Sequence, residues 1–361
     1  MHIAFESSSI STDQPTGISG YATALIEELL KTQSHNSFTL LNKLSRFKKR
    51  HKLYQHKSLP QHFYLPHVSA LLHRFDVLHS LDAYIPAWPG TKKITTIHDI
   101  FVLLNQDHEF FPASFIKRKK NNYHSICQRT DAIIAVSQST KDDIVNCLGF
   151  PADRIFVTHL GVDDQYHPRG KEEINSIKTK YRIAADYLLF VGNITPRKNT
   201  QRIIKAFDIA ALANNLQLVL CGAMSFNSQP TSDEIKKRGL ESKIKLLNYV
   251  DKADLPALYS GAQGFVYPTL YEGFGIPPLE AMACATPVLS SYIGAAPEVC
   301  GSDAILVDPY NIDAIADGMQ RLLSYSEQDI ANAKTRAASY TWQQCAEQTL
   351  SAYRKTLEIN H

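Results

Sequence analysis

The stretch that decides the fold is residues 267–301, YPTLYEGFGIPPLEAMACATPVLSSYIGAAPEVCG. Gly273 and Gly275 can adopt backbone angles closed to other residues, so this turn can approach a ligand closely and present amide N–H groups. Two prolines follow, which suit the first turn of a helix, and Leu279–Ala283 continues with good helix formers. The stretch therefore predicts a strand, a glycine turn and a helix start, where a phosphate can bind.

Two carboxylates flank this turn. Glu272 supplies acceptors beside the amides that follow it, and Glu280 lies in the first helical turn, where it can hydrogen-bond a diol near the phosphate. Each acid alone would also fit a plain structural role, as a solvated loop acid or as a complement to the helix dipole. As a pair around the glycines, they predict a site for a polyhydroxylated, phosphate-bearing ligand.

This segment resembles the signature of family-four retaining glycosyltransferases, which are sugar-nucleotide enzymes of the GT-B architecture with two glutamates separated by seven residues. Residues 189–199 (LFVGNITPRKN) and 249–259 (YVDKADLPALY) extend the resemblance over most of residues 157–320. The resemblance implies an α/β fold of the GT-B type, with two doubly wound Rossmann-like domains facing across a cleft.

The resemblance also implies roles for individual residues. Glu272 is expected to hold sugar hydroxyls and Glu280 the ribose diol. The other donor-binding positions that it implies in this half of the chain are Val250, Gly273, Phe274, Gly275 and Leu279.

The chain is long enough for two domains. At 361 residues it exceeds one ordinary core, and short apolar runs alternate with helical patterns in the manner of βαβ units. We expect an N-terminal acceptor-side domain over residues 1–167, completed by a helix at about 341–361, and a nucleotide-sugar domain over residues 168–340. The N-terminus lacks the pattern of a secretory signal and the six cysteines are scattered, which predicts a cytoplasmic protein with reduced thiols.

The predicted strands are the short apolar runs. In the first half they are residues 3–5, 38–41, 77–79, 94–97 and 132–136. In the second half they are residues 187–191, 216–221, 244–247, 264–267, 287–290 and 304–307. Helical patterns cover residues 20–31, 199–213 and 341–359.

A basic pair supplies the cations that glycosyl transfer needs. Negative charge builds on the departing diphosphate, and Arg197 and Lys198, between a strand and a helix, can meet it with a planar fork and a compact charge. The resemblance gives both this role, although many relatives carry an arginine where this chain has Asn193. Because the chain contains no Asp-x-Asp motif, we expect transfer without a metal or another cofactor.

Two segments of the N-terminal half complete the expected site. Residues 15–21, PTGISGY, resemble the family's glycine loop, with Gly17 nearest the donor and Gly20 mainly allowing tight helix packing. His98 and Asp99 follow a strand. The resemblance implies that His98 touches the transferred sugar, with Asp99 as the partner that fixes its tautomer.

One stretch of the N-terminal half is strongly basic. Residues 43–57 carry seven lysines and arginines and no acid, although the net charge of the chain is only +3. Such a stretch can contact an anionic membrane surface or an anionic acceptor, or it can be a solvated loop. No motif indicates nucleic-acid binding.

Together these features favour a retaining hexosyltransferase in surface polysaccharide or lipopolysaccharide synthesis. The preferred reaction moves mannose from GDP-mannose to a glycan or lipid-linked acceptor, with the protein peripheral at the inner face of the plasma membrane. Three alternatives stay open: a UDP-sugar-dependent transferase, a phosphorylase or epimerase of similar architecture, and a catalytically silent sugar-nucleotide-binding protein. The expected catalytic residues are His98, Arg197, Lys198 and Glu272.

Overall fold

The computed structural model describes residues 1–10, 17–32, 35–47, 54, 56–65, 68–69, 73–105, 110–210, 212–213, 215–225 and 228–359. The chain divides into two compact units. Unit 1 comprises Met1–Leu104, Ala113–Gly161 and Trp342–His361, and unit 2 comprises Asn105–Pro112 and Val162–Thr341. The last segment of the chain therefore packs with the first.

Unit 1 is built on one parallel sheet. Its described strands lie in the order β3-β2-β1-β4-β5-β6-β7, and all their pairings are parallel. The strands are β1 (His2–Glu6), β2 (Ser37–Lys43), β3 (Gln61–Tyr64), β4 (Val77–Ser80), β5 (Lys92–Ile97), β6 (Ala132–Ala135) and β7 (Ile155–Val157). The central strands are buried on both faces, as the continuous apolar runs predicted.

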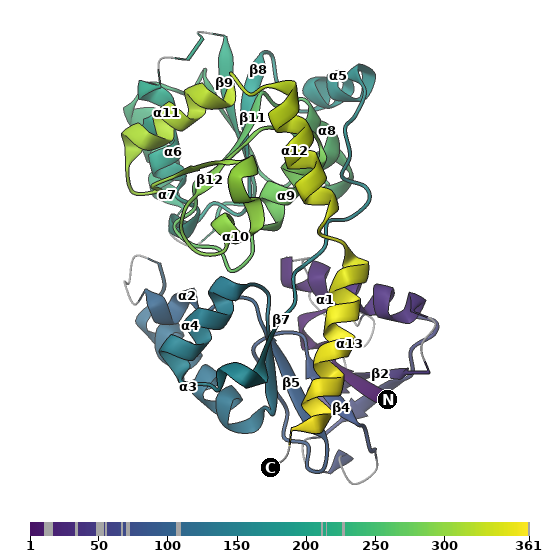
Figure 1. Ribbon diagram of the computed structural model, residues 1–361. Coiled ribbons are helices and arrows are strands. Elements are labelled where there is room, and N and C mark those ends of the chain that lie inside the picture. The colour runs from purple at the N-terminus through teal and green to yellow at the C-terminus, as the bar shows by residue number, and fades with distance from the viewer. Residues whose placement is uncertain are drawn as a thin grey trace. The chain divides into compact units, whose positions relative to one another are not determined.

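Helices cover both faces of this sheet. The helix α13 packs against α1, β5 and β6, and α4 packs against β6 and β7 (Figure 1). The helices are α1 (Gly17–Lys31), α2 (Phe101–Leu104), α3 (Ala113–Arg129), α4 (Gln138–Leu148) and α13 (Trp342–Glu358), with 3-10 turns η1 (Ser7–Ser9) and η4 (Ala152–Arg154).

Unit 2 repeats this plan with a second parallel sheet. The described strands lie in the order β10-β9-β8-β11-β12-β13. They are β8 (Asp186–Val191), β9 (Leu216–Cys221), β10 (Ile244–Leu247), β11 (Gly264–Tyr267), β12 (Val288–Ser291) and β13 (Ile305–Val307). The order reverses beside β8, which is the kind of switch point where open parallel sheets bind ligands at the carboxyl ends of their strands.

The helices of unit 2 gather in two groups. Those that pack around α6 lie on one face, and those that pack around α9 lie on the other (Figure 1). The first group is α6 (Thr200–Ile209), α7 (Gln229–Lys237) and α11 (Ile312–Leu322). The second is α5 (Lys171–Lys180), α8 (Leu255–Ser260), α9 (Ile276–Ala283) and α12 (Glu327–Ala338). Short elements complete the unit: α10 (Ala296–Cys300), η5 (Pro196–Lys198), η6 (Lys252–Asp254) and η7 (Gly301–Asp303).

The backbone at the start of the loop after β8 lies close to the backbone at the end of β9. Gly192 donates its N–H to the carbonyl of Cys221 at 2.8 Å. A Cβ atom on Gly222 would lie 2.0 Å from the Gly192 carbonyl oxygen, so no larger residue fits there without moving the backbone. The loop that carries the basic pair is therefore held against the neighbouring strand.

The α/β class with two doubly wound parallel sheets is confirmed. Within the described ranges, no helix combines the length and the apolar run that crossing a bilayer requires.

Candidate active site

The basic pair of unit 2 meets Glu272 at the carboxyl end of β8. Lys198 Nζ donates to Glu272 Oε1 at 2.7 Å and to the Tyr267 hydroxyl, while Arg197 Nη1 lies 3.7 Å from the same Glu272 oxygen. Arg197 also donates to the Tyr271 carbonyl at 3.1 Å. The Lys198 and Glu272 side chains are only 13% and 14% exposed, so their attraction is poorly screened by water. Two cations and one carboxylate leave this cluster with net positive charge, ready to receive an anion.

Tyr267 contacts Lys198 of this cluster through a neutral hydroxyl. Burial, and to a lesser degree the charge of Glu272, raise the pKa of its hydroxyl well above the ordinary value. The hydroxyl therefore keeps its proton and offers Lys198 an oxygen acceptor. The ring also lies 4.8 Å from Lys198 Nζ, which adds a cation–π contact.

Asn199 ties the loop of the basic pair to two other loops. It adopts a left-handed conformation with φ of 63°, which ends η5 and starts α6. Its buried side chain donates to the carbonyls of Pro268 at 2.9 Å and Pro309 at 2.7 Å. These prolines lie in the segments that follow β11 and β13, and Asn199 lies in the segment that follows β8. One side-chain amide therefore links the segments after three strands.

The glycine turn and α9 form as predicted, but Glu280 is the fifth residue of α9, so the prediction that it lies in the first helical turn is wrong. Gly275 has φ of 101° and precedes the first residue of α9. Since Pro277 and Pro278 have no N–H group, the turn can offer amides only from Gly273, Phe274, Gly275 and Ile276.

Three predicted donor-binding side chains lie in the core of unit 2. Leu279 is 0% exposed, Phe274 is 5% exposed and packs edge-on against Tyr340, and Val250 is 7% exposed. A donor can meet these residues mainly through their backbone atoms. The exposed aromatic side chain of residues 249–259 is instead Tyr249, at 72%.

Glu280 lies beside two buried tyrosines. It accepts a hydrogen bond from the Tyr259 hydroxyl at 2.9 Å and another from Tyr166. Burial raises the pKa of the Glu280 carboxyl to about 7, against the lowering effect of these two hydrogen bonds. The carboxyl thus changes charge near neutral pH. No role was predicted for either tyrosine from the sequence, because only their contact with Glu280, which lies elsewhere in the sequence, connects them to the site.

Two of the predicted residues of unit 1, His98 and Asp99, directly follow β5. His98 Nε2 is 3.0 Å from the Leu81 carbonyl, which can only accept, so this nitrogen carries the proton and Nδ1 is left as an acceptor. Asp99 Oδ1 accepts from the N–H of Phe101 at 3.1 Å and so caps α2. The expectation that Asp99 fixes the tautomer of His98 is therefore corrected: the Leu81 carbonyl does so.

A buried polar network stands behind His98. The Tyr21 ring meets the His98 ring edge-on at 4.8 Å, and its hydroxyl lies 3.0 Å from Thr96 Oγ1. Thr96 Oγ1 contacts His79 Nε2 at 2.8 Å, and His79 Nδ1 contacts the Tyr353 hydroxyl of α13 at 2.7 Å. Burial lowers the pKa of His79 to about 3, so the network is neutral at physiological pH.

Of the two glycines predicted to matter in the first loop, Gly20 does not have the surroundings that were expected. Gly17 is the first residue of α1, and its place nearest the donor stays a prediction. Gly20 was expected to allow tight helix packing, but it is exposed, and a Cβ atom built there would meet none of the described atoms within 4 Å. That prediction is wrong, because Gly20 faces away from the buried side of α1.

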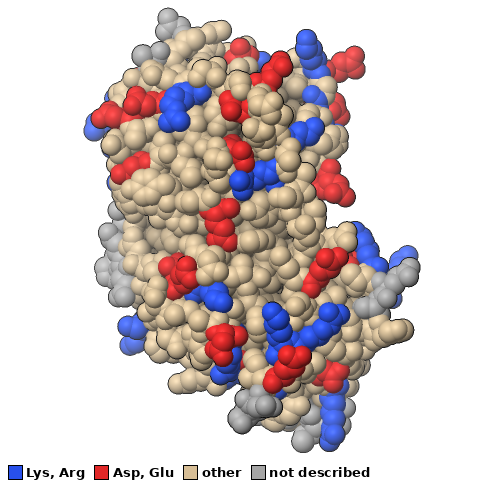
Figure 2. Space-filling view, in the orientation of Figure 1, with Lys and Arg blue, Asp and Glu red and all other residues tan. Residues whose placement is uncertain are grey.

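The basic stretch cannot be placed in full, because residues 48–53 and 55 lie outside the described residues. On the face shown in Figure 2, the described acidic and basic side chains are interspersed. Among the described residues, no group of three or more histidines, cysteines or acids could hold a metal ion.

Two parallel α/β units, one with cations and glutamates at its strand ends, define the class of GT-B glycosyltransferases. Comparison with known families places the chain within that class. Residues 25–166 match the model described as glycosyltransferase family 4, and residues 173–339 match that of group 1 glycosyl transferases. The chain belongs to glycosyltransferase family 4, and it is a nucleotide-sugar glycosyltransferase.

Similar proteins include two bacterial transferases. The chain is 33% identical to O-antigen chain mannosyltransferase B of Escherichia coli over 73% of this chain and 70% of that protein. It is 31% identical to O-antigen chain mannosyltransferase RfbU of Salmonella typhimurium over 70% of this chain and 74% of that protein. Sucrose-phosphate synthase from Thermosynechococcus elongatus has the same fold, with a TM-score of 0.79 and 17% identity over 99% of this chain and 100% of that one.

Proposed function

We propose that the protein transfers mannose from GDP-mannose, with retention of configuration, to a glycan or lipid-linked acceptor in surface polysaccharide synthesis. The contact of Lys198 and Arg197 with Glu272 carries this proposal, because it provides both the cations and the acceptor oxygens that a sugar diphosphate needs. The mannosyltransferase names of two relatives support the choice of sugar.

In this proposal each group of unit 2 has a separate task. Lys198 and Arg197 bind the diphosphate and stabilise the charge that develops on it as the glycosidic bond breaks. Glu272 orients sugar hydroxyls while keeping Lys198 in place before the donor arrives. Glu280 accepts hydrogen bonds from the ribose diol in its ionised form. His98, with its Nδ1 as acceptor, receives a hydrogen bond from the transferred sugar.

The cations take the place that a metal ion has in other transferases. A positive cluster at the ends of buried strands needs no reorganisation when the leaving group becomes charged. We therefore expect turnover to be unchanged after treatment with a chelator. A loss of turnover that added magnesium or manganese restores would contradict metal-independent transfer.

A donor screen tests the proposal directly. The protein is incubated with radiolabelled GDP-mannose, UDP-glucose and UDP-N-acetylglucosamine, each with the same panel of lipid-linked glycan acceptors. Labelled product from GDP-mannose alone is the expected result. If product forms only from a UDP-sugar, that sugar nucleotide is the donor instead of GDP-mannose. If a donor binds but neither product nor slow donor hydrolysis is detected, the protein is a silent sugar-nucleotide-binding protein.

Contact with an anionic membrane stays a separate prediction. Neutralising Lys48, Lys49 and Arg50 should weaken binding to anionic vesicles, more at low than at high salt, because exposed charges are screened by salt. A salt-insensitive or absent effect would favour a solvated loop.

A further inference from the structure

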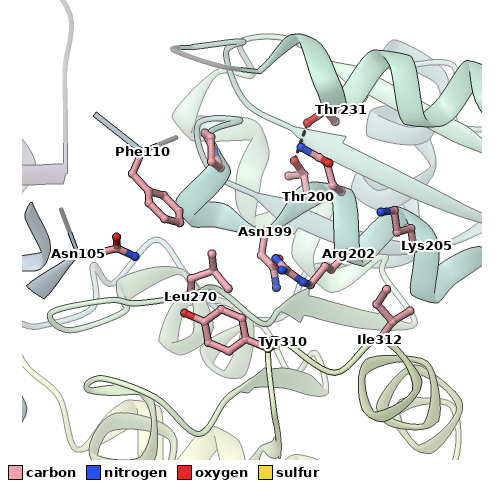
Figure 3. Close-up of a pocket in the computed structure, with 12 residues that line it drawn as sticks. Asn105, Phe110, Asn199, Thr200, Arg202, Lys205, Thr231, Leu270, Tyr310 and Ile312 are labelled. Atoms are coloured by element: carbon pink, nitrogen blue, oxygen red, sulfur yellow. Dashed lines mark hydrogen bonds between the residues drawn. The ribbon is translucent and has the colours of Figure 1, made fainter. Parts of the chain in front are cut away.

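Unit 2 contains a second pocket with cations, and the residues that flank the basic pair in the chain line it. A pocket of about 550 Å³ is lined by Pro196 and Asn199, whereas the intervening Arg197 and Lys198 reach Glu272. Arg202 and Lys205 of α6 form one wall, and Tyr310, which follows β13, lies on another (Figure 3). The described lining residues include two cations and no carboxylate.

Among the described residues, the partners found for the two cations of this pocket are neutral. Arg202 donates to the side-chain oxygen of Asn199 at 3.0 Å and lies 5.4 Å from the Tyr310 ring, both neutral partners. For Lys205 no hydrogen bond or ion pair is found within the described part of the chain. The acid of α6, Asp208, is held by Arg238 at 2.6 Å.

This arrangement costs stability in the absence of a ligand. Arg202 and Lys205 stand three residues apart on one helix, where like charges repel by a few tenths of a kcal/mol. Both side chains are partly buried rather than extended into solvent. Cations within a concave wall concentrate positive potential, and the arginine fork matches the oxygens of a phosphate.

We propose that this pocket binds a phosphate group other than the donor's own diphosphate. Arg202 holds two of its oxygens, Lys205 supplies the second charge, and the Tyr310 face keeps the guanidinium in place. The phosphate belongs either to a diphosphate-linked acceptor or to a free phosphate in solution. The inference does not depend on the donor sugar, because neither the basic pair nor Glu272 is among the residues that line the pocket.

The test is calorimetric binding of inorganic pyrophosphate with the donor site saturated by the nucleoside diphosphate that the donor screen selects. Wild-type protein is expected to bind one further pyrophosphate. The Arg202→Gln/Lys205→Gln variant should bind it at least about tenfold more weakly, as expected for lost charge-assisted hydrogen bonds. The control is Lys236→Gln/Lys237→Gln, which removes two exposed cations of α7 outside the pocket and should bind as the wild type does.

Absence of a second binding event in the wild type, or equal weakening in the control, would overturn the proposal. Equal thermal unfolding of both variants shows that the fold is retained. The source of the phosphate follows from acceptor kinetics. If the acceptor KM of the Arg202→Gln/Lys205→Gln variant rises for a diphosphate-linked glycan but not for the same glycan on a neutral aglycone, the acceptor supplies it. If neither KM changes while pyrophosphate binding is lost, the ligand is a free phosphate.

Discussion

The candidate residues of the two units are supported in opposite ways. In unit 2 they are charged and pair with one another: Lys198 with Glu272, and Glu280 with hydroxyls of Tyr259 and Tyr166. In unit 1 His98 stands against Tyr21, at the end of a neutral chain of hydroxyls and an imidazole. Unit 2 is thus suited to stabilising charge, and unit 1 to holding one ring in a fixed position and tautomer.

The contrast extends to pH. Glu280 has a raised pKa, so it favours the folded state in acid, and this contribution is lost as the pH rises from 4.5 to about 7. His79 has a lowered pKa, so its contribution is present above the ordinary value of 6.5 and is lost as the pH falls toward about 3. The two units should therefore respond to acid in opposite directions through these groups.

The largest expected effect is on turnover in unit 2. Lys198→Ala removes the compact charge beside the leaving diphosphate, so kcat should fall about 100- to 1,000-fold, or about 3–4 kcal/mol of barrier. Steady-state kinetics with the preferred donor measures it, and Lys237→Ala is the matched control on an exposed lysine. Unchanged turnover would show that charge stabilisation does not depend on this cluster.

The second effect is on the stability of unit 2. Glu280→Gln keeps the shape of the side chain but removes its titration. At pH 8 the free energy of unfolding of the variant should therefore exceed that of the wild type by at most about 3 kcal/mol. The difference should shrink to about 0.4 kcal/mol near pH 4.5, where the wild-type carboxyl is protonated in the folded state and half protonated in the unfolded state. Denaturant titrations at both pH values measure this, and an equal difference at both would exclude a raised pKa.

The same carboxyl should govern donor affinity. Because only the ionised form accepts hydrogen bonds from both ribose hydroxyls without donating, donor binding by the wild type should strengthen as the pH rises through about 7. In Glu280→Ala the affinity should be lower and this pH dependence absent. Calorimetry with the nucleoside diphosphate decides it, and unaffected affinity would reject the ribose role.

A smaller effect tests the neutral chain in unit 1. Tyr353→Phe deletes the hydroxyl that meets His79 and leaves a fully buried imidazole nitrogen without its partner, which should cost about 1–2 kcal/mol of unfolding free energy. Tyr249→Phe, at a 72% exposed position, is the control and should be neutral. Equal stability of the two variants would mean that the hydroxyl contributes nothing.

The smallest expected effect concerns His98. A neutral hydrogen bond to the sugar is worth about 1 kcal/mol, so His98→Ala should lower kcat about fivefold and leave affinity for the nucleoside diphosphate unchanged. A loss as large as that of Lys198→Ala would remove the contrast between the two units.

The sequence predicted every described strand of unit 2, its two edge strands included, but missed the two edge strands of unit 1. The runs at 216–221, 244–247 and 264–267 coincide with β9, β10 and β11. The strands β3 and β7 went unrecognised. Both lie at the edges of the sheet of unit 1, where a strand is less buried and need not be an apolar run: β3 reads QHFY, and β7 has three residues.

The candidate site was predictable in its residue types but not in its contacts. A resemblance of motifs indicated Arg197, Lys198, Glu272 and Glu280, yet the bond from Lys198 to Glu272 joins residues 74 positions apart, and nothing local encodes it. The pocket beside Arg202 was missed for the same reason, since its walls come from separate loops. The mistaken role of Gly20 shows that a glycine in a loop motif does not reveal which way it faces.

The side chain of Asn199 has a consequence for protein engineering. Since its amide bridges the segments after β8, β11 and β13, these segments are not independent modules. Libraries that diversify one of them to alter substrate choice should retain this asparagine, and grafts from relatives should exchange all three together. A chimera that imports a single segment is expected to lose activity through misregistered loops rather than through wrong chemistry.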